Sequence, residues 1–278
     1  MAMGIHAELG RRTLIMGILN VTPDSFSDGG RFNTVENALR HARQLIAEGA
    51  DILDIGGEST RPGSTPVPTE EELRRVVPVL EALRREGCPV PISIDTYKAE
   101  VAERALALGA SIINDIWGGQ EDPRILEVAA VSRAPIILMH NRKDMNYGPD
   151  VVADVLDDLR TAAGKALDAG VAKEQIILDP GIGFAKHRAH NLRLMNRLSE
   201  VVGLGYPVLL GTSRKRFIRE TLNETADHVE EATIATTVLG IYQGVHMVRV
   251  HQVGANVQAA RMTDAILRAE SEALQTQV

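Results

Sequence analysis

The sequence predicts an α/β protein built as a single (β/α)8 barrel, and three observations support this prediction. Short, β-branched apolar segments alternate with helical segments along the whole chain, which is typical of a parallel sheet. Eight of these apolar segments end in polar residues, as barrel strands do where their carboxyl ends form a site. The 278 residues, 44% of them hydrophobic, suit one barrel as well as two smaller domains, but no linker divides them. We therefore expect one domain over residues 1–278, with residues 1–12 as a flexible leader.

The first half of the chain predicts four strand and helix pairs. Strands are expected at 14–19, 52–55, 92–94 and 112–113, and helices at 35–46, from 69, at 98–108 and at 125–131. Gly49, Gly87 and Gly109 follow the first three helices, where glycine readily adopts the left-handed conformation of a helix C-cap. Thr69, followed three residues later by Glu72, predicts a capping box at the start of the second helix.

The second half repeats the pattern. Strands are expected at 136–139, 176–178, 208–210 and 247–250, and helices at 151–169, 192–202, 230–243 and 257–274. An open, doubly wound sheet would show the same alternation. Its dinucleotide-binding form, however, needs a third glycine after the pair Gly181 and Gly183, which is missing here. The closed barrel is therefore the preferred architecture.

Composition excludes several classes of function. The net charge of -7 argues against a general binder of nucleic acid or of membrane surfaces, because both depend on a cationic field. Residues 14–19 are too short to span a membrane and lack the features of a signal peptide. A single cysteine, Cys88, rules out an intrachain disulfide and favours a reducing, cytoplasmic location.

Hydrogen-bond acceptors follow four of the predicted strands. They are Asp54, Asp95, Asn114 and Asp179, and a buried carboxylate is tolerated only when it is paired or hydrogen-bonded. A flat heterocycle with adjacent N–H donors, such as an aminopyrimidinone ring, would satisfy these groups. The alternative is that Asp54 and Asp95 cap the helices that follow them.

Cationic residues follow other strands and predict an anion site in this acidic protein. Phosphate sites in such barrels favour the loops after the last two strands, and arginine offers paired donors to phosphate oxygens. The alternative is a solvated surface cluster, particularly for Arg214 and Arg216. Asn20 after the first strand raises the possibility of Mg²⁺, which needs few protein oxygens when phosphate and water supply the rest. The cationic set is Arg61, Arg214, Lys215, Arg216, Arg249 and His251.

Two long segments resemble one family closely. Residues 20–30, NVTPDSFSDGG, and residues 54–63, DIGGESTRPG, are similar to the bacterial dihydropteroate synthases of folate biosynthesis. Shorter segments follow the same family pattern in order over nearly the whole chain: 93–96, 114–115, 139–140, 179–184, 211–215 and 248–251.

The resemblance implies an enzyme and its substrates. Members of this family are (β/α)8 barrels, usually homodimers. They join p-aminobenzoate to 6-hydroxymethyl-7,8-dihydropterin diphosphate and release pyrophosphate with the help of Mg²⁺. The small molecules are then the expected partners, and neither nucleic acid nor a membrane is expected.

Site residues are carried over position by position. The resemblance implies a pterin pocket of Asp95, Asn114, Met139, Asp179 and Lys215. It implies a pyrophosphate site of Asn20, Arg61, Arg249 and His251, with Asn20 also holding the metal. It implies a p-aminobenzoate site of Phe26, Thr60, Arg61, Pro62 and Phe184. Arg216 stands where the family often has a serine that contacts the carboxylate of p-aminobenzoate, so that contact is not carried over.

The family mechanism gives catalytic roles to Asp95, Lys215 and Arg249. Loss of pyrophosphate would leave a cationic pterin methylene group, which Asp95 would stabilise, while Arg61, Arg249, His251 and Mg²⁺ stabilise the leaving group. Two other functions on the same barrel stay open: a pterin-dependent methyltransferase, which has no need of the anion site, and a pterin-binding protein without turnover.

Overall fold

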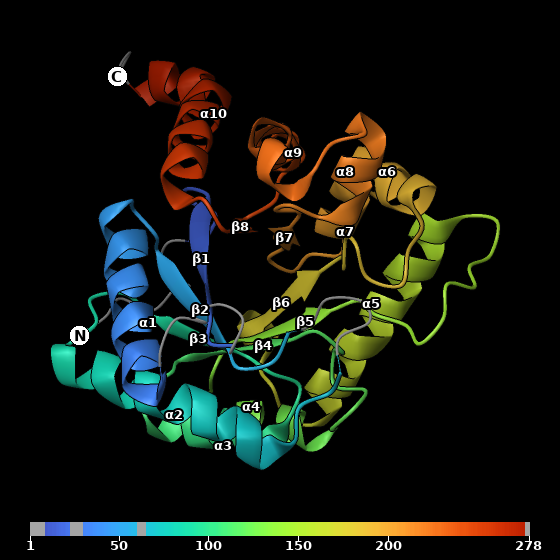
Figure 1. Ribbon diagram of the computed structural model, residues 1–278. Helices are drawn as coiled ribbons and strands as arrows, with labels where there is room; N and C mark the ends of the chain where they lie inside the picture. Colours follow the sequence, from blue (N-terminus) through green and yellow to red (C-terminus); the bar gives the residue numbers. More distant parts are fainter. Residues whose placement is uncertain (1–8, 23–29, 60–64, 276–278) are drawn as a thin grey trace.

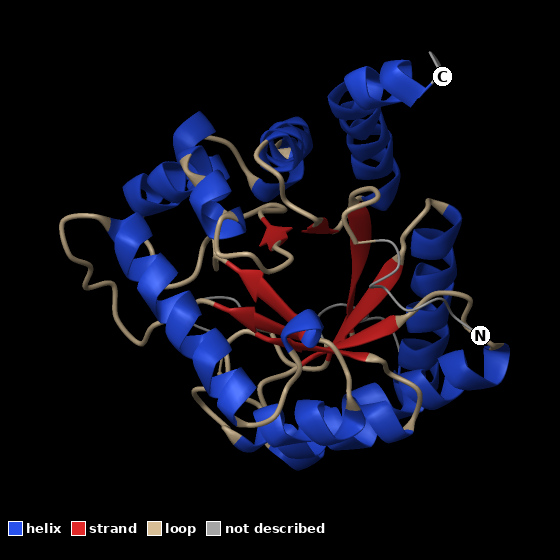
Figure 2. Cartoon of the chain, turned by 180° about the vertical axis from the view of Figure 1, so that it is seen from behind, coloured by secondary structure: helices blue, strands red, loops and turns tan. Residues whose placement is uncertain are grey.

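The computed structural model describes residues 9–22, 30–59 and 65–275, and it confirms the predicted barrel. Eight parallel strands form one sheet in the order β6-β5-β4-β3-β2-β1-β8-β7. A parallel bridge between Leu178 and Val208 joins the two outermost strands of this order and closes the sheet. Helices surround the strands (Figures 1 and 2).

The predicted strands are all present, and no predicted strand end is off by more than two residues. Each is short, apolar and almost completely buried, as expected when helices cover the outside of a barrel. Their bounds are β1 Leu14–Asn20, β2 Ile52–Gly56, β3 Ile92–Asp95, β4 Ile112–Asp115, β5 Ile136–Met139, β6 Ile176–Asp179, β7 Leu209–Gly211 and β8 Met247–Val250.

The first and last predicted helices begin earlier than expected, at Gly30 and Val253, and the helices differ further in two places. The predicted helix at 192–202 is two helices, because Arg197 leaves the helical conformation at a φ of -124°. The seven-residue helix α8 was not expected, since two turns are too few for a periodic pattern to stand out. The α-helices are α1 Gly30–Ala47, α2 Thr69–Glu86, α3 Ala99–Ala107, α4 Arg124–Ser132, α5 Val151–Asp168, α6 Arg188–Asn196, α7 Leu198–Val202, α8 Arg216–Leu222, α9 Glu230–Tyr242 and α10 Val253–Gln275. None of the helices described here is long and apolar enough to cross a membrane.

The predicted capping box is wrong. Pro68, not Thr69, is the N-cap of α2, and it makes no side-chain cap. Glu72 is instead buried and accepts a hydrogen bond of 2.5 Å from Lys98. A bond to a buried ammonium group is stronger than one to a backbone N–H, so tertiary structure overrides the local motif.

The expected leader does not extend to Arg12. The guanidinium group of Arg12 donates to both carboxylate oxygens of Asp51, at 2.9 and 2.7 Å. Leu9 packs on the apolar layer inside the barrel. Residues 1–8 lie outside the described residues.

Two layers of side chains fill the interior of the barrel, and their order positions the site. The lower layer is apolar and consists of Leu14, Met16, Ile52, Ile112, Ile137, Ile177, Leu209 and Met247. Side chains along a strand alternate between its two faces, so the residue two positions further on points the same way. Those residues include Asp54 after Ile52, Asn114 after Ile112, Asp179 after Ile177 and Arg249 after Met247. The apolar layer is therefore the floor beneath a polar site.

Candidate functional site

Arg249 is the centre of the polar layer. Its Nε donates to Oδ2 of Asp54 at 2.6 Å, and its Nη2 donates to Oδ2 of Asp95 at 2.7 Å. Asn114 adds a third contact, from its Nδ2 to Oδ2 of Asp54 at 3.2 Å. The sequence predicted acidic and basic groups in separate clusters, but one guanidinium group joins two of the carboxylates. Since both carboxylates bind Arg249, the alternative that Asp54 and Asp95 cap helices is wrong.

These carboxylates are deeply buried and incompletely paired. The side chains of Asp54 and Asp95 are 0% and 5% exposed. Burial raises the pKa of Asp95, and the neighbouring Arg249 opposes that rise. Within the described part of the chain, Oδ1 of Asp54 and Oδ1 of Asp95 accept no hydrogen bond. An unpaired buried oxygen is costly, so these two atoms mark places where N–H groups of a ligand can bind.

Asp179 and Lys215 form a second part of the site. Oδ1 of Asp179 accepts from the backbone N–H of Gly181 at 2.7 Å, while Lys215 donates to the backbone carbonyl of Ile182. A Cβ atom placed on Gly211 would lie 3.8 Å from Nζ of Lys215 and 4.0 Å from Oδ2 of Asp179. Gly211, Lys215 and Asp179 are therefore neighbours. Nζ of Lys215 also lies 4.6 Å from the ring centre of Phe184. The predicted pterin residues and Phe184 are therefore close together.

The charges in this second part are coupled. Burial raises the pKa of Asp179, and the cation of Lys215 opposes the rise. Burial lowers the pKa of Lys215 to about 8, and Asp179 opposes that change. Arg249 also acts on both groups, which links them to the centre of the polar layer.

The remaining predicted residues that the structure describes lie at the same end of the barrel. Met139 ends β5 and pairs in register with Asp179, and Asn20 ends β1 beside Gly56. His251 directly follows β8, and its Nδ1 lies 2.9 Å from the hydroxyl of Ser213, in the loop after β7. Phe26, Thr60, Arg61 and Pro62 lie outside the described residues.

Arg216 takes no part in this group. It begins α8, its side chain is 78% exposed, and its Nε donates to Glu220 one turn later at 2.6 Å. Arg214 pairs loosely with Glu230 at 3.6 Å. The alternative of a solvated surface cluster therefore holds for Arg216, whereas Lys215 and Arg249 face inward.

One buried residue beside the site, Lys186, was missed from the sequence. It lies in the loop after β6, and its Nζ is 2.7 Å from Nδ1 of His140, which the sequence did place at the end of a strand. A lysine two residues after Phe184 in a glycine-rich loop is a weak signal, because nothing local shows that its side chain turns inward. Within the described residues, no group of three or more His, Cys, Asp or Glu side chains could hold a metal on its own.

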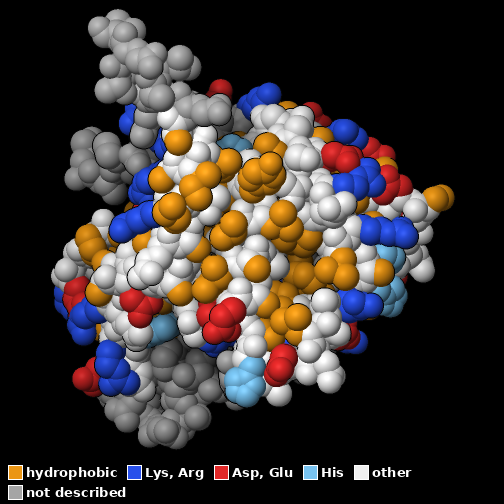
Figure 3. Space-filling model, turned by 90° about the horizontal axis from the view of Figure 1, so that it is seen from above, with side chains coloured by type: hydrophobic (Ala, Val, Ile, Leu, Met, Phe, Trp, Pro, Cys, Tyr) orange, Lys and Arg blue, Asp and Glu red, His pale blue; other side chains and the backbone are white. Residues whose placement is uncertain are grey.

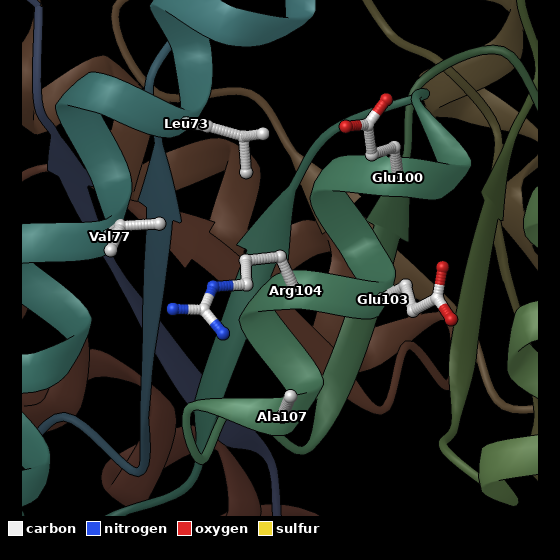
Figure 4. A pocket seen from close by; sticks show the side chains of 6 residues that line it. All are labelled: Leu73, Val77, Glu100, Glu103, Arg104 and Ala107. Carbon is white, nitrogen blue, oxygen red and sulfur yellow. The ribbon is translucent and has the colours of Figure 1, made fainter.

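A groove on the outside of the barrel is unrelated to this site. It lies between α2 and α3, and Figure 4 shows Leu73 and Val77 facing Arg104 across it. Its charged residues lie on the outer helices, and none of the predicted site residues lines it.

Comparison with known proteins identifies the family. Residues 16–251 match the family of pterin binding enzymes. The chain is 54% identical to the dihydropteroate synthase of Bacillus subtilis over 256 residues, which are 92% of this chain and 89% of that protein. It is 52% identical to that of Clostridium beijerinckii, over 94% of this chain and 96% of that protein.

Solved structures agree. The dihydropteroate synthase of Clostridium difficile, crystallised in the presence of pteroic acid, superposes with a TM-score of 0.91 at 52% identity, over 94% of this chain and 99% of that one. The enzyme of Xanthomonas albilineans with 4-aminobenzoic acid has a TM-score of 0.88 at 46% identity, over 92% and 93%. The chain belongs to the pterin binding enzymes and, within them, to the dihydropteroate synthases.

Proposed function

We propose that this chain condenses 6-hydroxymethyl-7,8-dihydropterin diphosphate with p-aminobenzoate at the carboxyl ends of its strands, releasing 7,8-dihydropteroate and pyrophosphate. The observation that carries the proposal is the guanidinium group of Arg249, bound to Asp54 and Asp95, in the same layer as Asn114 and Asp179. The carboxylates and the amide of this layer can accept hydrogen bonds from a flat ring, and the guanidinium group can bind the diphosphate attached to that ring.

The pterin ring is held by acceptors below it. The unpaired Oδ1 atoms of Asp54 and Asp95 and the second oxygen of Asp179 are suited to the N–H groups of an aminopyrimidinone edge. Asn114 contributes an amide beside them, and Met139 supplies an apolar, polarisable surface against the ring. Lys215 is a donor for the ring carbonyl. These groups leave few polar atoms unsatisfied once the ring is bound.

The diphosphate is held by cationic and neutral donors at the rim. Arg249 is 20% exposed, so part of its side chain is open to a ligand while the rest is anchored to the two carboxylates. His251 is adjacent, and Arg61 completes the proposed set from outside the described residues. The positive charge of the two arginines stabilises the pyrophosphate as it leaves.

Mg²⁺ fits this site only as a substrate-bound ion. Asn20, at the end of β1, is the protein oxygen that we propose as its ligand, with diphosphate and water supplying the others. This agrees with the lack of a cluster of acidic or histidine ligands in the described part of the chain. When bound, Mg²⁺ neutralises charge on the leaving pyrophosphate.

The chain's own residues assist the chemical step through charge. Departure of pyrophosphate leaves a positive methylene group on the dihydropterin, and the ionised carboxylate of Asp95 stabilises it. The amine of p-aminobenzoate then attacks that carbon. We propose that Phe184 packs on p-aminobenzoate, together with Phe26, Thr60, Arg61 and Pro62, which are outside the described residues.

Release of pyrophosphate tests the proposal. We expect release to require both p-aminobenzoate and Mg²⁺. Asp179→Ala and Lys215→Ala should weaken pterin binding, whereas Arg249→Ala should mainly weaken retention of pyrophosphate. Methyl transfer from a reduced folate without pyrophosphate release would contradict the proposal, as would binding of the pterin without turnover.

We also propose that the chain acts as a homodimer in the cytoplasm. Apolar side chains gather on one face, where α9 and α10 pack together (Figure 3). They include Tyr242 at 71% exposure, Met262 at 62% and Ile266 at 63%. Val257, by contrast, is buried, so α10 packs on the barrel by one side only. A contiguous apolar face of this kind supports an interface between two copies.

The unpaired thiol of Cys88 is compatible with a reducing compartment.

A further inference from the structure

A buried lysine lies beneath the loop after β6. The side chain of Lys186 is turned inward, and its Nζ lies 3.0 Å from the carbonyl oxygen of Gly181, 3.2 Å from that of Phe184 and 2.7 Å from Nδ1 of His140. The residue is only 7% exposed. No step proposed above uses Lys186, although it touches the loop that carries Asp179 and Phe184.

The contacts of His140 show whether Lys186 is an ammonium group or a neutral amine. Nε2 of His140 lies 3.0 Å from Oδ2 of Asp158, the oxygen to which Arg142 donates at 2.6 Å. Desolvation raises the pKa of Asp158, but bonds from His140 and Arg142 outweigh it and lower the pKa to about 2, so Asp158 is ionised. An ionised oxygen needs a donor, so Nε2 carries the proton of the imidazole.

The other nitrogen of His140 must then accept. The ring is neutral, since burial lowers its pKa to about 4, and a neutral imidazole with a proton on Nε2 has a lone pair on Nδ1. Lys186 therefore donates to Nδ1 as well as to the two carbonyl oxygens. Three acceptors require three N–H donors, which only the ammonium form has. Burial lowers the pKa of Lys186 to about 7, so the ammonium form predominates below that pH.

Side chains from below bind each residue of the loop 181–184. Lys186 binds the carbonyl oxygens of Gly181 and Phe184, Lys215 binds that of Ile182, and Asn191 accepts from the N–H of Gly183 at 2.7 Å. A backbone bond from the N–H of Phe184 to the carbonyl oxygen of Gly181, at 3.1 Å, closes the loop, and these side chains hold it from outside. Removing Lys186 would take the side-chain donor away from two of these four positions, the carbonyl oxygens of Gly181 and Phe184.

The charge of Lys186 also acts on Asp179. The cations that lower the pKa of Asp179 are Lys215 after β7, Lys186 in its own loop and Arg249 on β8. The other groups that face Lys186 are neutral His140 just after β5, Arg142 in the following loop, Asp158 on α5 and Lys215 after β7. Asp179 and Asp158 are thus the anions that retain the charge on Lys186.

We infer that Lys186 is a positioning residue for the pterin site: its ammonium group, oriented by His140 and Asp158, holds the loop 181–184 in place and keeps a positive charge beside Asp179. The inference rests on the proposed function, because it assumes that ionised Asp179 accepts hydrogen bonds from the pterin. It assigns Lys186 no contact with substrate.

The test compares binding of 6-hydroxymethylpterin to the wild type and to Lys186→Met between pH 4.5 and 6.5. Throughout this range the pH is below the pKa of Lys186, so its ammonium form predominates. Displacement of the loop should weaken binding at pH 6.5 by up to about 100-fold. Loss of the cation should also move the acid limb of binding to higher pH, by up to about one unit, because ionised Asp179 loses support. A purely structural role would not move this limb.

Two further variants separate the causes. In an Asp179→Asn background, Lys186→Met should not shift the acid limb that Asp95 still causes, since the carboxylate on which Lys186 acts is gone. Thr237→Val, which removes a buried 2.8 Å bond to Asn256 between α9 and α10, is the control for general destabilisation and should leave the limb unchanged. An unchanged limb and unchanged affinity in folded Lys186→Met would overturn the inference. Failure of the wild type to bind the pterin would instead overturn the proposed function.

A measurement on the unmodified protein covers the case in which Lys186→Met does not fold. With ¹⁵N-labelled histidine, NMR should show His140 as the neutral tautomer with its proton on Nε2 and a lone pair on Nδ1. A proton on Nδ1 would mean that Lys186 accepts rather than donates there, and the inference would fail.

Discussion

At the scale of single residues, Asp95 links the geometry of the site to a pH dependence. Burial raises its pKa, and Arg249 only partly opposes the rise. The ionised form, which we propose stabilises the methylene cation, is therefore lost at a higher pH than for an ordinary aspartate, whose pKa is about 3.9. We expect kcat/KM for pyrophosphate release to fall as the pH drops through this raised value.

Substitution identifies the group responsible. Asp95→Asn should remove the contribution of Asp95 to that acid limb, leaving only that of Asp179, and lower the rate by about 100-fold or more, the typical effect of losing one electrostatic contact to a transition state. Asp115→Asn is the comparison variant: its negative charge is one of those that raise the pKa of Asp95, so its loss should shift the limb to lower pH without removing it. Burial also raises the pKa of Asp115, to about 6, but its carboxylate accepts from the backbone of Trp117 and Gly119 in a turn. If Asp115→Asn moved the limb and Asp95→Asn did not, the role of Asp95 would be refuted.

Gly181 is a second residue whose identity the site requires. Its φ is 66°, and a Cβ there would lie 1.9 Å from the carbonyl oxygen of His140. Gly205 has a similar φ of 77° but has no atom within 4 Å of such a Cβ. Gly205→Ala should therefore cost only the left-handed conformation, about 1 to 2 kcal/mol. Gly181→Ala should cost at least about 2 kcal/mol more, because backbone must move. Urea denaturation measures both; equal losses would contradict the predicted clash.

At the scale of elements, Lys98 ties α2 and α3 to the segment after β2. Its ammonium group donates to Glu58 and Glu72 at 2.5 Å each and to the carbonyl oxygen of Val67 at 2.7 Å. The side chain of Glu72 is 1% exposed, and burial raises its pKa while Lys98 opposes the rise. Lys98→Met would leave this carboxylate without its cation, so we expect a loss of about 3 to 5 kcal/mol in the free energy of unfolding.

Two comparisons test this explanation. Adding Glu72→Met to Lys98→Met should restore part of the loss, because an apolar pair needs no compensating charge. Arg216→Ala breaks an exposed pair with Glu220 and should cost less than about 1 kcal/mol. If urea denaturation showed the same small loss of stability for Lys98→Met as for Arg216→Ala, the ion pair between Lys98 and Glu72 would not be important for stability.

At the scale of the whole molecule, the apolar face of α9 and α10 predicts self-association. Tyr242→Asp or Ile266→Asp places a charge on this face, where burial against a second copy would be costly. Sedimentation velocity should then show a shift from dimer to monomer, with the far-UV circular dichroism unchanged. Val131→Asp, at a site on α4 that is 87% exposed, is the control and should remain dimeric. A wild type that is monomeric at micromolar concentration would contradict the proposed dimer.

The sequence predicted the eight strands closely because each has a short β-branched core followed by a polar residue, a signal that is local and repeated. It placed Asp95, Asn114, Asp179 and Arg249 at the carboxyl ends of strands for the same reason. It failed at α8, which is too short for periodicity, and at Glu72, whose partner Lys98 lies 26 positions away. Local pattern could not show that a distant ammonium group outcompetes a helix cap.

The sequence by itself therefore determined the alternation of strands and helices, the polar strand ends and, by its long motifs, the family. Only the tertiary structure decided which of the polar residues meet. Asp54 and Arg249 are 195 positions apart, yet closure of the barrel brings their side chains to 2.6 Å. Lys186 likewise turns away from solvent because two carbonyl oxygens of its own loop and Nδ1 of His140 accept hydrogen bonds from its ammonium group. Pairing between distant charges depends on burial and geometry, which arise only when the strands assemble.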